Sequence, residues 1–449
     1  MPKDLRGTLY RNGPGLFERA GYRKRNLLDG DGMIQAFDFS GDRVRFRNRF
    51  VRTAKYVAEE NAGVYKYPTW TTRAPGGMYA NLGVPDIHTQ AGVTTIVKHG
   101  RLLAFGEVGL PYALDPASLE TVGEFEIAEP TTGINFKAHS KTDARTGDWI
   151  LIGVEFGRKQ RLHVVVRGRD GRVKSRSAYT PERNVYIHDF FATDHHVIVS
   201  LHPLEPAPIG LLTGLGSFTE TLSWRPEHGN LLLIFNRNGG RQPTMIEAPA
   251  RFMWHALNAY ESGNEVIADF VGYQEPDHFI GPNPSLTAIM HGRRGTAKFP
   301  GEVRRYVIDI TARRVSEDMV SGENQEFPMV NPAHVCAPHR VGYFAHGKRG
   351  GWVHNGIAAI DFNTGKTETF SFGAKHRVGE PIFAAKPGHR HDGTTNREPG
   401  WILAEVLDGA AGASSLAVFD ARSIAAGPIA RIVLTHHVPI SFHGCWHAT

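Results

Sequence analysis

The sequence predicts an all-β protein built from many short strands. Runs rich in β-branched residues recur from one end of the chain to the other, turn signals separate them, and none continues into a long helical pattern. The composition agrees, because 50 glycines and 27 prolines among 449 residues favour many turns and few long helices.

Strands and turns alternate along the whole chain. The clearest strand-like runs are residues 94–97, 149–156, 163–166, 197–201, 231–235, 265–270, 356–362, 415–419 and 431–434. Turn signals stand at residues 12–14, 29–32, 170–171, 238–240 and 363–365. The alternation has no linker-like interruption, which favours four-stranded sheets repeated around an axis, and we expect one domain over residues 1–449. No WD or kelch repeat is present, so periodicity alone does not single out a propeller.

The net charge and the number of cysteines argue against several classes of function. The formal net charge is +6, but lysines and arginines are spread along the chain, so we expect solvated surface charge and no nucleic-acid partner. Cys336 and Cys445 are too few for a disulfide framework or a cysteine metal site, which indicates a reducing compartment. The sequence has neither a signal-peptide h-region nor an apolar run of spanning length, so we expect a cytoplasmic protein.

One segment departs from the alternation of strands and turns. Residues 206–218 are apolar, uncharged and too short to cross a bilayer. Two interpretations stay open, a buried loop and an exposed patch that touches a membrane or a greasy substrate.

The sequence holds 23 histidines, and their context has to select those with a function. No H-E-x-x-H, C-x-x-C, G-x-G-x-x-G or P-loop pattern occurs, so the zincin, zinc-finger, dinucleotide and nucleotide-phosphate classes lack their motifs. Four histidines stand at or beside predicted strand ends in distinctive contexts. They are His139 in AHSKTD, His188 in YIHDF, His255 in MWHALNAYE and His443 in SFHG.

These contexts resemble those of the carotenoid cleavage oxygenase family. The similarity extends over nearly the whole chain, in blocks that follow the family's order. The blocks are residues 7–14, 28–33, 101–107, 109–116, 326–328 and 379–381. The resemblance implies a single seven-bladed β-propeller whose loops form a cap over an iron site on the axis, with one histidine ligand from each of four blades.

The resemblance implies that His139, His188, His255 and His443 bind one Fe²⁺ ion. Four neutral imidazoles suit a borderline divalent transition metal, and a rigid closed scaffold can bring such distant residues together. With four protein ligands in an octahedral frame, two positions remain for dioxygen or water.

The resemblance also assigns a carboxylate to three of the four histidines. Glu107 is matched to His188, Glu326 to His255 and Glu380 to His443, which leaves His139 without an acidic partner. A carboxylate that accepts the second ring N–H fixes the orientation of a ligand histidine and raises its basicity.

Two further features have less specific interpretations. By its offset from Glu107, Val93 matches a family position where a small branched side chain limits access to an open iron position, although an ordinary strand valine fits as well. Residues 29–32, with the sequence DGDG, resemble a fragment of a calcium loop that lacks the remaining ligands, and we expect a structural turn.

The family resemblance implies an iron(II)-dependent dioxygenase that cleaves a C=C double bond with O2 and yields two carbonyl products. The double bond supplies the electrons, so no flavin or nicotinamide is needed, in agreement with the missing dinucleotide motif.

The expected substrate is a hydrophobic alkene, namely a carotenoid or apocarotenoid, with a stilbene or phenylpropene as the alternative. Gly106 favours the first, because the stilbene-cleaving branch carries a lysine there for the substrate phenol, and a buried phenolate without a counter-charge is costly. The apolar residues 206–218 fall where family members carry a membrane-facing patch, which favours the same choice and a peripheral membrane contact.

Two function classes outside the oxygenases remain. A zinc hydrolase would need a general base near the metal, and usually a mixed set of histidine and carboxylate ligands. A catalytically silent binding propeller would be expected to lose ligand histidines, whereas all four are present.

The chain also departs from the family at its start. It begins six residues before the block at residues 7–14, whereas family members usually carry an extra segment there. A truncated or misassigned start is one interpretation, and it leaves an N-terminal membrane contact without support.

Overall fold

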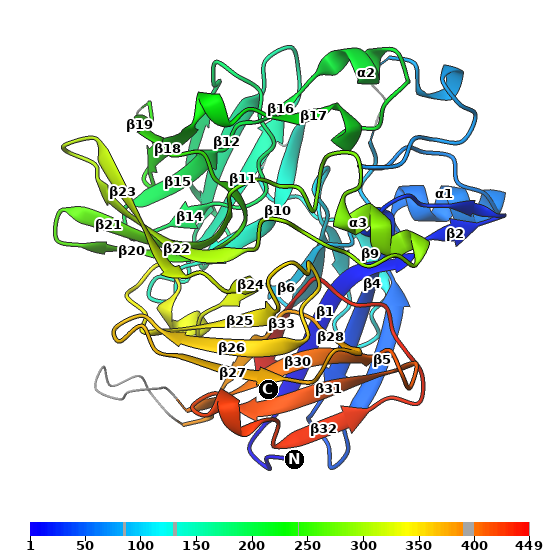
Figure 1. Cartoon of the computed structure of the whole chain (residues 1–449), viewed down its shortest axis with the longest axis vertical. Coiled ribbons are helices and arrows are strands. Elements are labelled where there is room, and N and C mark those ends of the chain that lie inside the picture. Colours follow the sequence, from blue (N-terminus) through cyan, green and yellow to red (C-terminus); the bar gives the residue numbers. More distant parts are fainter. Residues whose placement is uncertain (84–86, 129–132, 241, 389–398, 449) are drawn as a thin grey trace.

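Antiparallel strands group into seven large sheets that surround a common axis like the blades of a propeller (Figure 1). The computed structural model describes residues 1–83, 87–128, 133–240, 242–388 and 399–448. The predicted all-β class and seven-bladed architecture are confirmed, and each of the nine strand-like runs lies in a strand and extends at most one residue beyond it. The cap of loops over the metal site stays a prediction.

The blades follow one another along the chain, except that blade 1 takes one strand from the C-terminal end. Blade 1 contains β33 (His443–Ala448), β1 (Gly7–Leu16), β4 (Asp31–Asp38) and β5 (Arg45–Phe50); blade 2 contains β6 (Thr94–Lys98), β7 (Arg101–Phe105), β8 (Tyr112–Leu114) and β9 (Thr121–Glu124). Blade 3 contains β10 (Ile134–Thr142), β11 (Trp149–Glu155), β12 (Arg161–Arg167) and β13 (Val173–Tyr179); blade 4 contains β14 (Phe191–Ala192), β15 (His196–Leu201), β18 (Asn230–Asn236) and β19 (Thr244–Ala248).

The last three blades complete the ring. Blade 5 contains β20 (Phe252–Ser262), β21 (Glu265–Tyr273), β22 (Glu302–Asp309) and β23 (Arg314–Ser321); blade 6 contains β24 (Asn324–Met329), β25 (Val341–Gly347), β26 (Gly356–Asp361) and β27 (Thr367–Ser371). Blade 7 contains β28 (His376–Val378), β29 (Ile382–Ala385), β30 (Gly400–Asp408), β31 (Ala413–Asp420) and β32 (Ala430–Val433).

Short elements lie outside the blades. Two hairpins are formed by β2 (Glu18–Arg19) with β3 (Tyr22–Arg23) and by β16 (Leu204–Pro206) with β17 (Leu222–Trp224). The α-helices are α1 (Ala54–Ala62), α2 (Pro208–Leu212) and α3 (Ser285–Ala288). The 3₁₀ helices are η1 (Leu27–Asp29), η2 (Tyr79–Asn81), η3 (Thr219–Thr221), η4 (Pro226–His228), η5 (Ile289–His291), η6 (Pro332–His334) and η7 (Ile424–Ala426).

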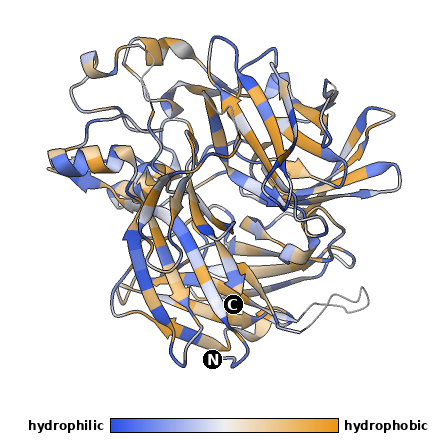
Figure 2. Ribbon diagram, turned by 180° about the vertical axis from the view of Figure 1, so that it is seen from behind, coloured by the Kyte–Doolittle hydropathy of each residue, from blue (hydrophilic) through white to orange (hydrophobic). Residues whose placement is uncertain are grey.

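The hydrophobic core lies between neighbouring blades, and the strands carry bands of hydrophobic residues (Figure 2). Alternate residues of β11 show how one strand serves two interfaces. Ile150 and Ile152 pack against residues of blade 4, whereas Trp149 and Leu151 pack against residues of blade 2. Because successive side chains on a strand point to opposite faces, strands buried on both faces read as nearly continuous apolar runs.

The ring closes by pairing its two ends. β33 runs antiparallel to β1, with Gly7 opposite Ala448 and Asn12 opposite His443. This pairing contradicts the turn expected at residues 12–14, which lie inside β1. Gly13 allows the backbone near Ser441 to pass close to β1, because a Cβ on Gly13 would lie 2.5 Å from Cα of Ser441.

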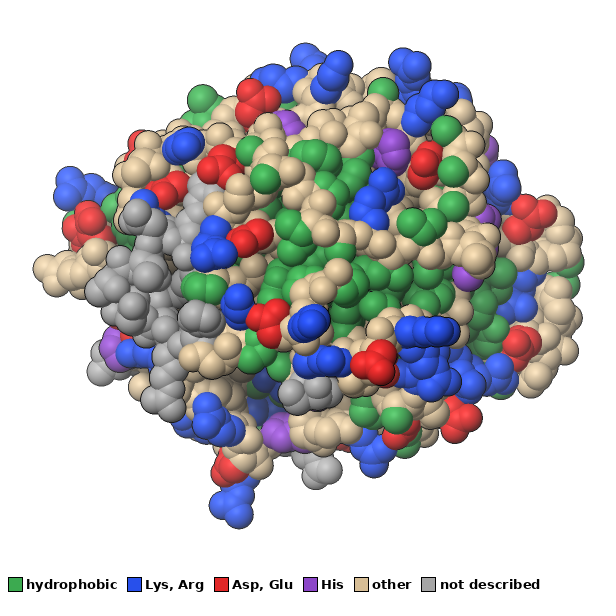
Figure 3. Space-filling view, turned by 90° about the horizontal axis from the view of Figure 1, so that it is seen from below, with side chains coloured by type: hydrophobic (Ala, Val, Ile, Leu, Met, Phe, Trp, Pro, Cys, Tyr) green, Lys and Arg blue, Asp and Glu red, His purple; other side chains and the backbone are tan. Residues whose placement is uncertain are grey.

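The surface agrees with the even spread of charge along the sequence. On the face shown in Figure 3, basic side chains lie in separate groups with acidic ones among them, around a central area where hydrophobic side chains gather. Within the described ranges, no helix combines the length and the apolar character needed to cross a membrane.

Candidate metal centre

Four histidines from four blades converge at the propeller axis. His139 belongs to β10 and His255 to β20, His188 lies just before β14, and His443 begins β33. One ring nitrogen from each histidine can be chosen such that all four lie within 4.8 Å of one another. His139 is partly exposed and the other three are buried. The four residues named from the sequence are therefore together in space.

Two of these histidines lie at irregularities in strand pairing, whereas strand ends were expected. His139 stands in the stretch where the pairing of β10 with β11 changes register. His255 stands in a similar stretch of β20 against β21. Such bulges bend a strand and re-aim its side chains, which turns both imidazoles toward the axis.

Three glutamates contact three of the histidines at their Nδ1 atoms. A carboxylate oxygen of Glu107 lies 2.5 Å from Nδ1 of His188, and one of Glu326 lies 2.5 Å from Nδ1 of His255. A carboxylate oxygen of Glu380 lies 2.9 Å from Nδ1 of His443. These are the pairs that the resemblance assigned. His139 instead meets the other three imidazoles, with centroid distances of 4.7, 5.0 and 4.5 Å. Carboxylates on Nδ1 leave each Nε2 available to a metal ion.

Buried cations that the sequence analysis missed hold two of the glutamates. Nζ of Lys137 lies 3.1 Å from Glu107, and Nη1 of Arg11 lies 3.2 Å from Glu380. Burial alone would raise the pKa of Glu107, but the charges of His188 and Lys137 lower it to about 2. The available signal was spacing, since Lys137 lies two residues before a ligand candidate on the same strand, and in a regular strand that spacing places two side chains on one face.

Glu326 is held differently. The backbone N–H of Phe327 donates a hydrogen bond to its carboxylate. Phe327 has a φ of 53°, a left-handed conformation that is uncommon for a bulky residue and typical of functional sites. Burial and the nearby Glu326 carboxylate raise the pKa of Tyr273 well above its ordinary value, so Tyr273 stays a neutral donor.

Asp189 connects two of the segments that carry histidines. It directly follows His188, and its Oδ2 accepts a hydrogen bond from the backbone N–H of Ala256, which directly follows His255 (2.9 Å). Nζ of Lys141 lies 2.9 Å from its Oδ1. This buried carboxylate therefore links blades 4 and 5 beside the four histidines.

Burial favours the metal-binding form of His139 and His443. Burial and the three neighbouring histidines lower the pKa of His139 well below its ordinary value, and burial also lowers the pKa of His443. In His255 the effect of burial is outweighed by Glu326, which raises its pKa. Neutral imidazole is the ligand form.

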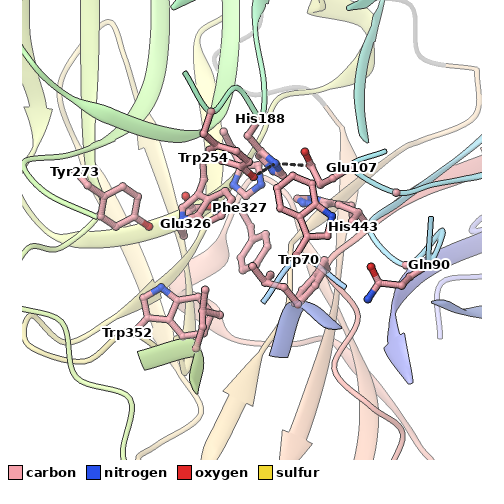
Figure 4. Close-up of a pocket in the computed structure, with 18 of the residues that line it drawn as sticks. Trp70, Gln90, Glu107, His188, Trp254, Tyr273, Glu326, Phe327, Trp352 and His443 are labelled. Atoms are coloured by element: carbon pink, nitrogen blue, oxygen red, sulfur yellow. Dashed lines mark hydrogen bonds and ion pairs between the residues drawn. The ribbon is translucent and has the colours of Figure 1, made fainter. Parts of the chain in front are cut away.

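An apolar cavity opens onto the histidines (Figure 4). His188, His255 and His443 line it together with Glu107 and Glu326. Its apolar wall includes Leu28, Trp70, Val93, Trp254, Phe327 and Phe442. A cavity of this composition suits a hydrophobic ligand placed directly beside the four histidines.

The donor set fits a divalent transition metal ion. Nε2 of His255 is buried without a hydrogen-bond partner among the described residues, and Nε2 of His139 lies 3.0 Å from Nε2 of His188. Buried polar atoms are rarely left unpaired. A metal ion between the rings would satisfy these nitrogens, and imidazole ligands suit iron among other ions.

The structure also places Val93, Gly106 and residues 29–32, which the sequence singled out. Val93 and Gly106 both line the cavity. A Cβ at Gly106 would lie 2.5 Å from Oγ1 of Thr89, so a lysine there would require that threonine to move. Residues 29–32 have the expected structural role but do not form a separate turn, because Asp29 ends η1 and Asp31 begins β4. Asp29 accepts a hydrogen bond from the Thr71 backbone at 3.0 Å, and Asp31 lies 2.8 Å from Nζ of Lys55.

Known proteins resemble this chain over its whole length. The family model described as retinal pigment epithelial membrane protein matches residues 1–448. Apocarotenoid-15,15'-oxygenase of Synechocystis sp. is 30% identical, with 100% of this chain and 92% of that protein covered. Isoeugenol monooxygenase of Pseudomonas nitroreducens is 27% identical, with 99% and 92% covered. The solved structure of the cobalt-substituted Synechocystis apocarotenoid oxygenase has a TM-score of 0.91 at 29% identity and covers 100% and 94%. The chain therefore belongs to the retinal pigment epithelial membrane protein family, which is the family of the carotenoid cleavage oxygenases.

Proposed function

We propose that this chain is an iron(II)-dependent dioxygenase that cleaves a C=C double bond of a carotenoid or apocarotenoid into two carbonyl products. The observation that carries the proposal is the cluster of four histidines that faces an apolar cavity. Family membership supports it, and the 30% identity with an apocarotenoid-15,15'-oxygenase over the whole chain favours an apocarotenoid.

In this proposal His139, His188, His255 and His443 hold the iron, and iron(II), when bound, supplies the capacity to bind and activate O2. The overall reaction consumes one O2 and leaves one oxygen atom on each carbon of the former double bond, so no further reductant is needed. The histidines serve as ligands, and the carboxylates on their Nδ1 atoms keep the rings in one orientation.

The cavity wall positions the alkene and keeps water away from it. Aromatic and aliphatic side chains offer a long hydrophobic substrate extensive contact and no competing hydrogen bonds. Val93 lies on this wall with Glu107 and His188, and we assign to it the restriction of access to one open coordination position.

A second candidate is cleavage of a stilbene or phenylpropene double bond by the same chemistry. The similarity to isoeugenol monooxygenase over 99% of this chain favours it. Against it, Gly106 supplies no cation for a phenolate, and the cation that the structure brings nearby, Lys137, is already paired with Glu107. The apocarotenoid therefore stands first.

The test is anaerobic loading with iron(II), followed by reaction with an apocarotenal or a 4-hydroxystilbene under ¹⁸O₂. We expect aldehyde products that carry the label, and their loss in His188→Ala. His195→Ala is the matched control, because that side chain is exposed and lies away from the cluster. Full turnover in iron-depleted protein, or hydration of the alkene, would contradict the proposal.

We also propose a peripheral membrane contact through residues 206–218. Ile209, Leu212 and Leu215 are exposed by 73%, 50% and 64%. A second apolar segment, residues 78–82, lies beside them, because the N–H of Gly83 donates to the carbonyl oxygen of Leu212 at 3.0 Å. The exposed side chains favour the patch over the buried loop, the two interpretations that the sequence left open.

A further inference from the structure

A second cavity reaches the histidine cluster, and we call it the axial cavity. His139, His255 and His443 line it, whereas His188, His255 and His443 line the apolar cavity. His139 is the partly exposed member of the four, and of the two cavities it lines only the axial one. The axial cavity is also the larger, with a volume of about 480 Å³ against about 70 Å³ for the apolar cavity.

The order of residues along the chain places the two cavities on opposite sides of the histidines. Residues just before three of the histidines line the apolar cavity, namely Tyr186, Trp254 and Phe442. Residues that follow the same three histidines line the axial cavity, namely 189–192, 256–259 and 444–447. The axial cavity therefore extends from the cluster along the inner strands of several blades, in the direction in which β20 and β33 leave it.

The far end of the axial cavity lies at the surface. Its lining includes Arg169 and His447, and both are exposed. His443 and His447 belong to the same strand, and four residues of a strand span about 13 Å. The axial cavity therefore connects the histidine cluster with bulk water over roughly this depth.

Charged side chains in the axial cavity distinguish it from the apolar one. Nζ of Lys141 lies 2.9 Å from Asp189, so its charge is compensated. Nζ of Lys98 donates to Oγ1 of Thr142 at 2.7 Å and has no acidic partner in the described part of the chain. A roomy cavity with polar groups can hold water, whereas an ion that crosses an apolar cavity loses its hydration without replacement. A hydrated ion can therefore approach the cluster more easily through the axial cavity.

We propose that a divalent metal ion reaches and leaves the four histidines through the axial cavity, and that the uncompensated charge of Lys98 slows its passage. This inference rests on the proposed metal centre and gives the ion and the hydrophobic substrate separate entrances. The ion can then be exchanged while a substrate fills the apolar cavity.

The first experiment obstructs each cavity in turn with a tryptophan and follows bound Co²⁺ by its absorption. Uptake by metal-free protein and loss to excess EDTA are measured for the wild type, Ala144→Trp and Leu28→Trp. Ala144 is partly exposed and lines the axial cavity, whereas Leu28 lines the apolar one. We expect Ala144→Trp to slow uptake and loss alike, by about 10-fold for a barrier raised by about 1.4 kcal/mol. Leu28→Trp should change neither rate.

The dissociation constant for Co²⁺ separates an obstructed route from a damaged site. An obstruction slows both directions equally, so the Kd of Ala144→Trp should equal that of the wild type. A disturbed set of ligands would raise the Kd instead. Ala117→Trp is the matched control for the added bulk, because Ala117 is exposed and lies outside the lining of both cavities.

Lys98→Met tests the same route without an obstruction, because it removes the charge and keeps most of the side-chain volume. Co²⁺ uptake should be at least about 2-fold faster than in the wild type at low ionic strength. The difference should shrink in about 0.5 M salt, which screens the charge. Lys375→Met is the control, since Lys375 is exposed and lies outside the lining of the axial cavity.

Two results would overturn the inference. One is unchanged rates in both Ala144→Trp and Lys98→Met, and the other is slower exchange in Leu28→Trp than in Ala144→Trp. If Ala144→Trp does not fold, the uptake rate of Lys98→Met decides. Absent binding of Co²⁺ by the wild type would refute both the metal centre and the route. The rates need no substrate, so missing alkene cleavage beside normal exchange would contradict the proposed function and leave the route intact.

Discussion

The three glutamates beside the histidines differ in the groups that compensate their negative charge. Lys137 and Arg11 neutralise Glu107 and Glu380, whereas Glu326 has the backbone of its own neighbour and a neutral tyrosine beside it. Glu326 therefore contributes a less compensated negative charge to its imidazole than the other two carboxylates. Removal of the Glu326 charge should therefore change the basicity of the His255 imidazole directly.

We expect Glu326→Gln to weaken metal binding by about 10- to 100-fold, because a neutral amide makes His255 a poorer ligand. The fold should be unchanged, since the amide has nearly the same shape. Equilibrium dialysis against Co²⁺ or Fe²⁺, with circular dichroism for folding, measures both effects. Glu182→Gln is the control at an exposed position. Unchanged metal retention would refute the role given to Glu326, while the four histidines would remain the ligand candidates.

A buried lysine outside the histidine cluster should make stability depend on pH. Burial and the neighbouring Lys55 lower the pKa of Lys24 to about 8. An unfolded chain keeps this proton up to about pH 10.4, so between pH 8 and 10 the unfolded state binds more protons than the folded one. The contribution of Lys24 to stability therefore rises with pH in this window.

The measurement is urea unfolding of the wild type and of Lys24→Met at pH 8 and pH 9.5. The free energy of unfolding of the wild type should increase relative to the variant by up to about 1.4 kcal/mol per pH unit. Lys375→Met, at an exposed position, should show no such trend. An equal difference at both pH values would mean that Lys24 keeps its proton in the fold.

At the scale of elements, strands could be predicted from the sequence, but their irregularities could not. Period-two and continuous apolar runs identified β11 and β21, because burial on one or both faces leaves a direct trace in composition. The bulges at His139 and His255 depend on register with a partner strand, which local sequence does not encode. The nine-residue helix α1 was missed because it is too short to show a helical period clearly.

The same limit applies to the site. The histidines and the three glutamates could be named because their local contexts match family motifs. Arg11 and Asp189 could not, because their importance lies in contacts with Glu380 and with the Ala256 backbone, each far away in the sequence. The role of a buried charged residue can be inferred only when the group that it contacts is known.

The apolar elements at residues 78–82 and 208–215 allow a test of membrane contact. Replacing Ile209 and Leu215 by serine should reduce sedimentation with phospholipid vesicles about 10-fold or more, since both side chains are largely exposed and would lose apolar burial in the lipid. Val433→Ser removes a side chain that is 69% exposed on blade 7 and serves as the control. Equal sedimentation of all three proteins would remove support for the contact.

At the scale of the whole molecule, the closed ring makes each blade depend on two neighbours. Hydrophobic clusters join blade 1 to blade 2 and also to blade 7, so the N-terminal strands are enclosed on both sides. We therefore propose that the chain is one domain that unfolds as one cooperative unit, with no blade that remains stable alone.

Gly444→Ala tests this at the point of closure. A Cβ there would lie 2.3 Å from the carbonyl oxygen of Tyr10 and 2.7 Å from Cδ of Arg11, which forces β33 away from β1. We expect a loss of more than about 2 kcal/mol in one transition that far-ultraviolet circular dichroism and tryptophan fluorescence report together. Gly41→Ala is the control, since its nearest neighbour would be 3.7 Å away. Two separated transitions would indicate more than one domain.

The pairing of β33 with β1 also sets an order of events during synthesis. His443 leaves the ribosome after the other three histidines, and it reaches them only when the last strand joins the first blade. A growing chain therefore carries an incomplete set of the four candidate ligands until β33 pairs with β1. A metal ion held by all four histidines would link β33 to blades 3, 4 and 5, so its removal would weaken the pairing of β33 with β1 first.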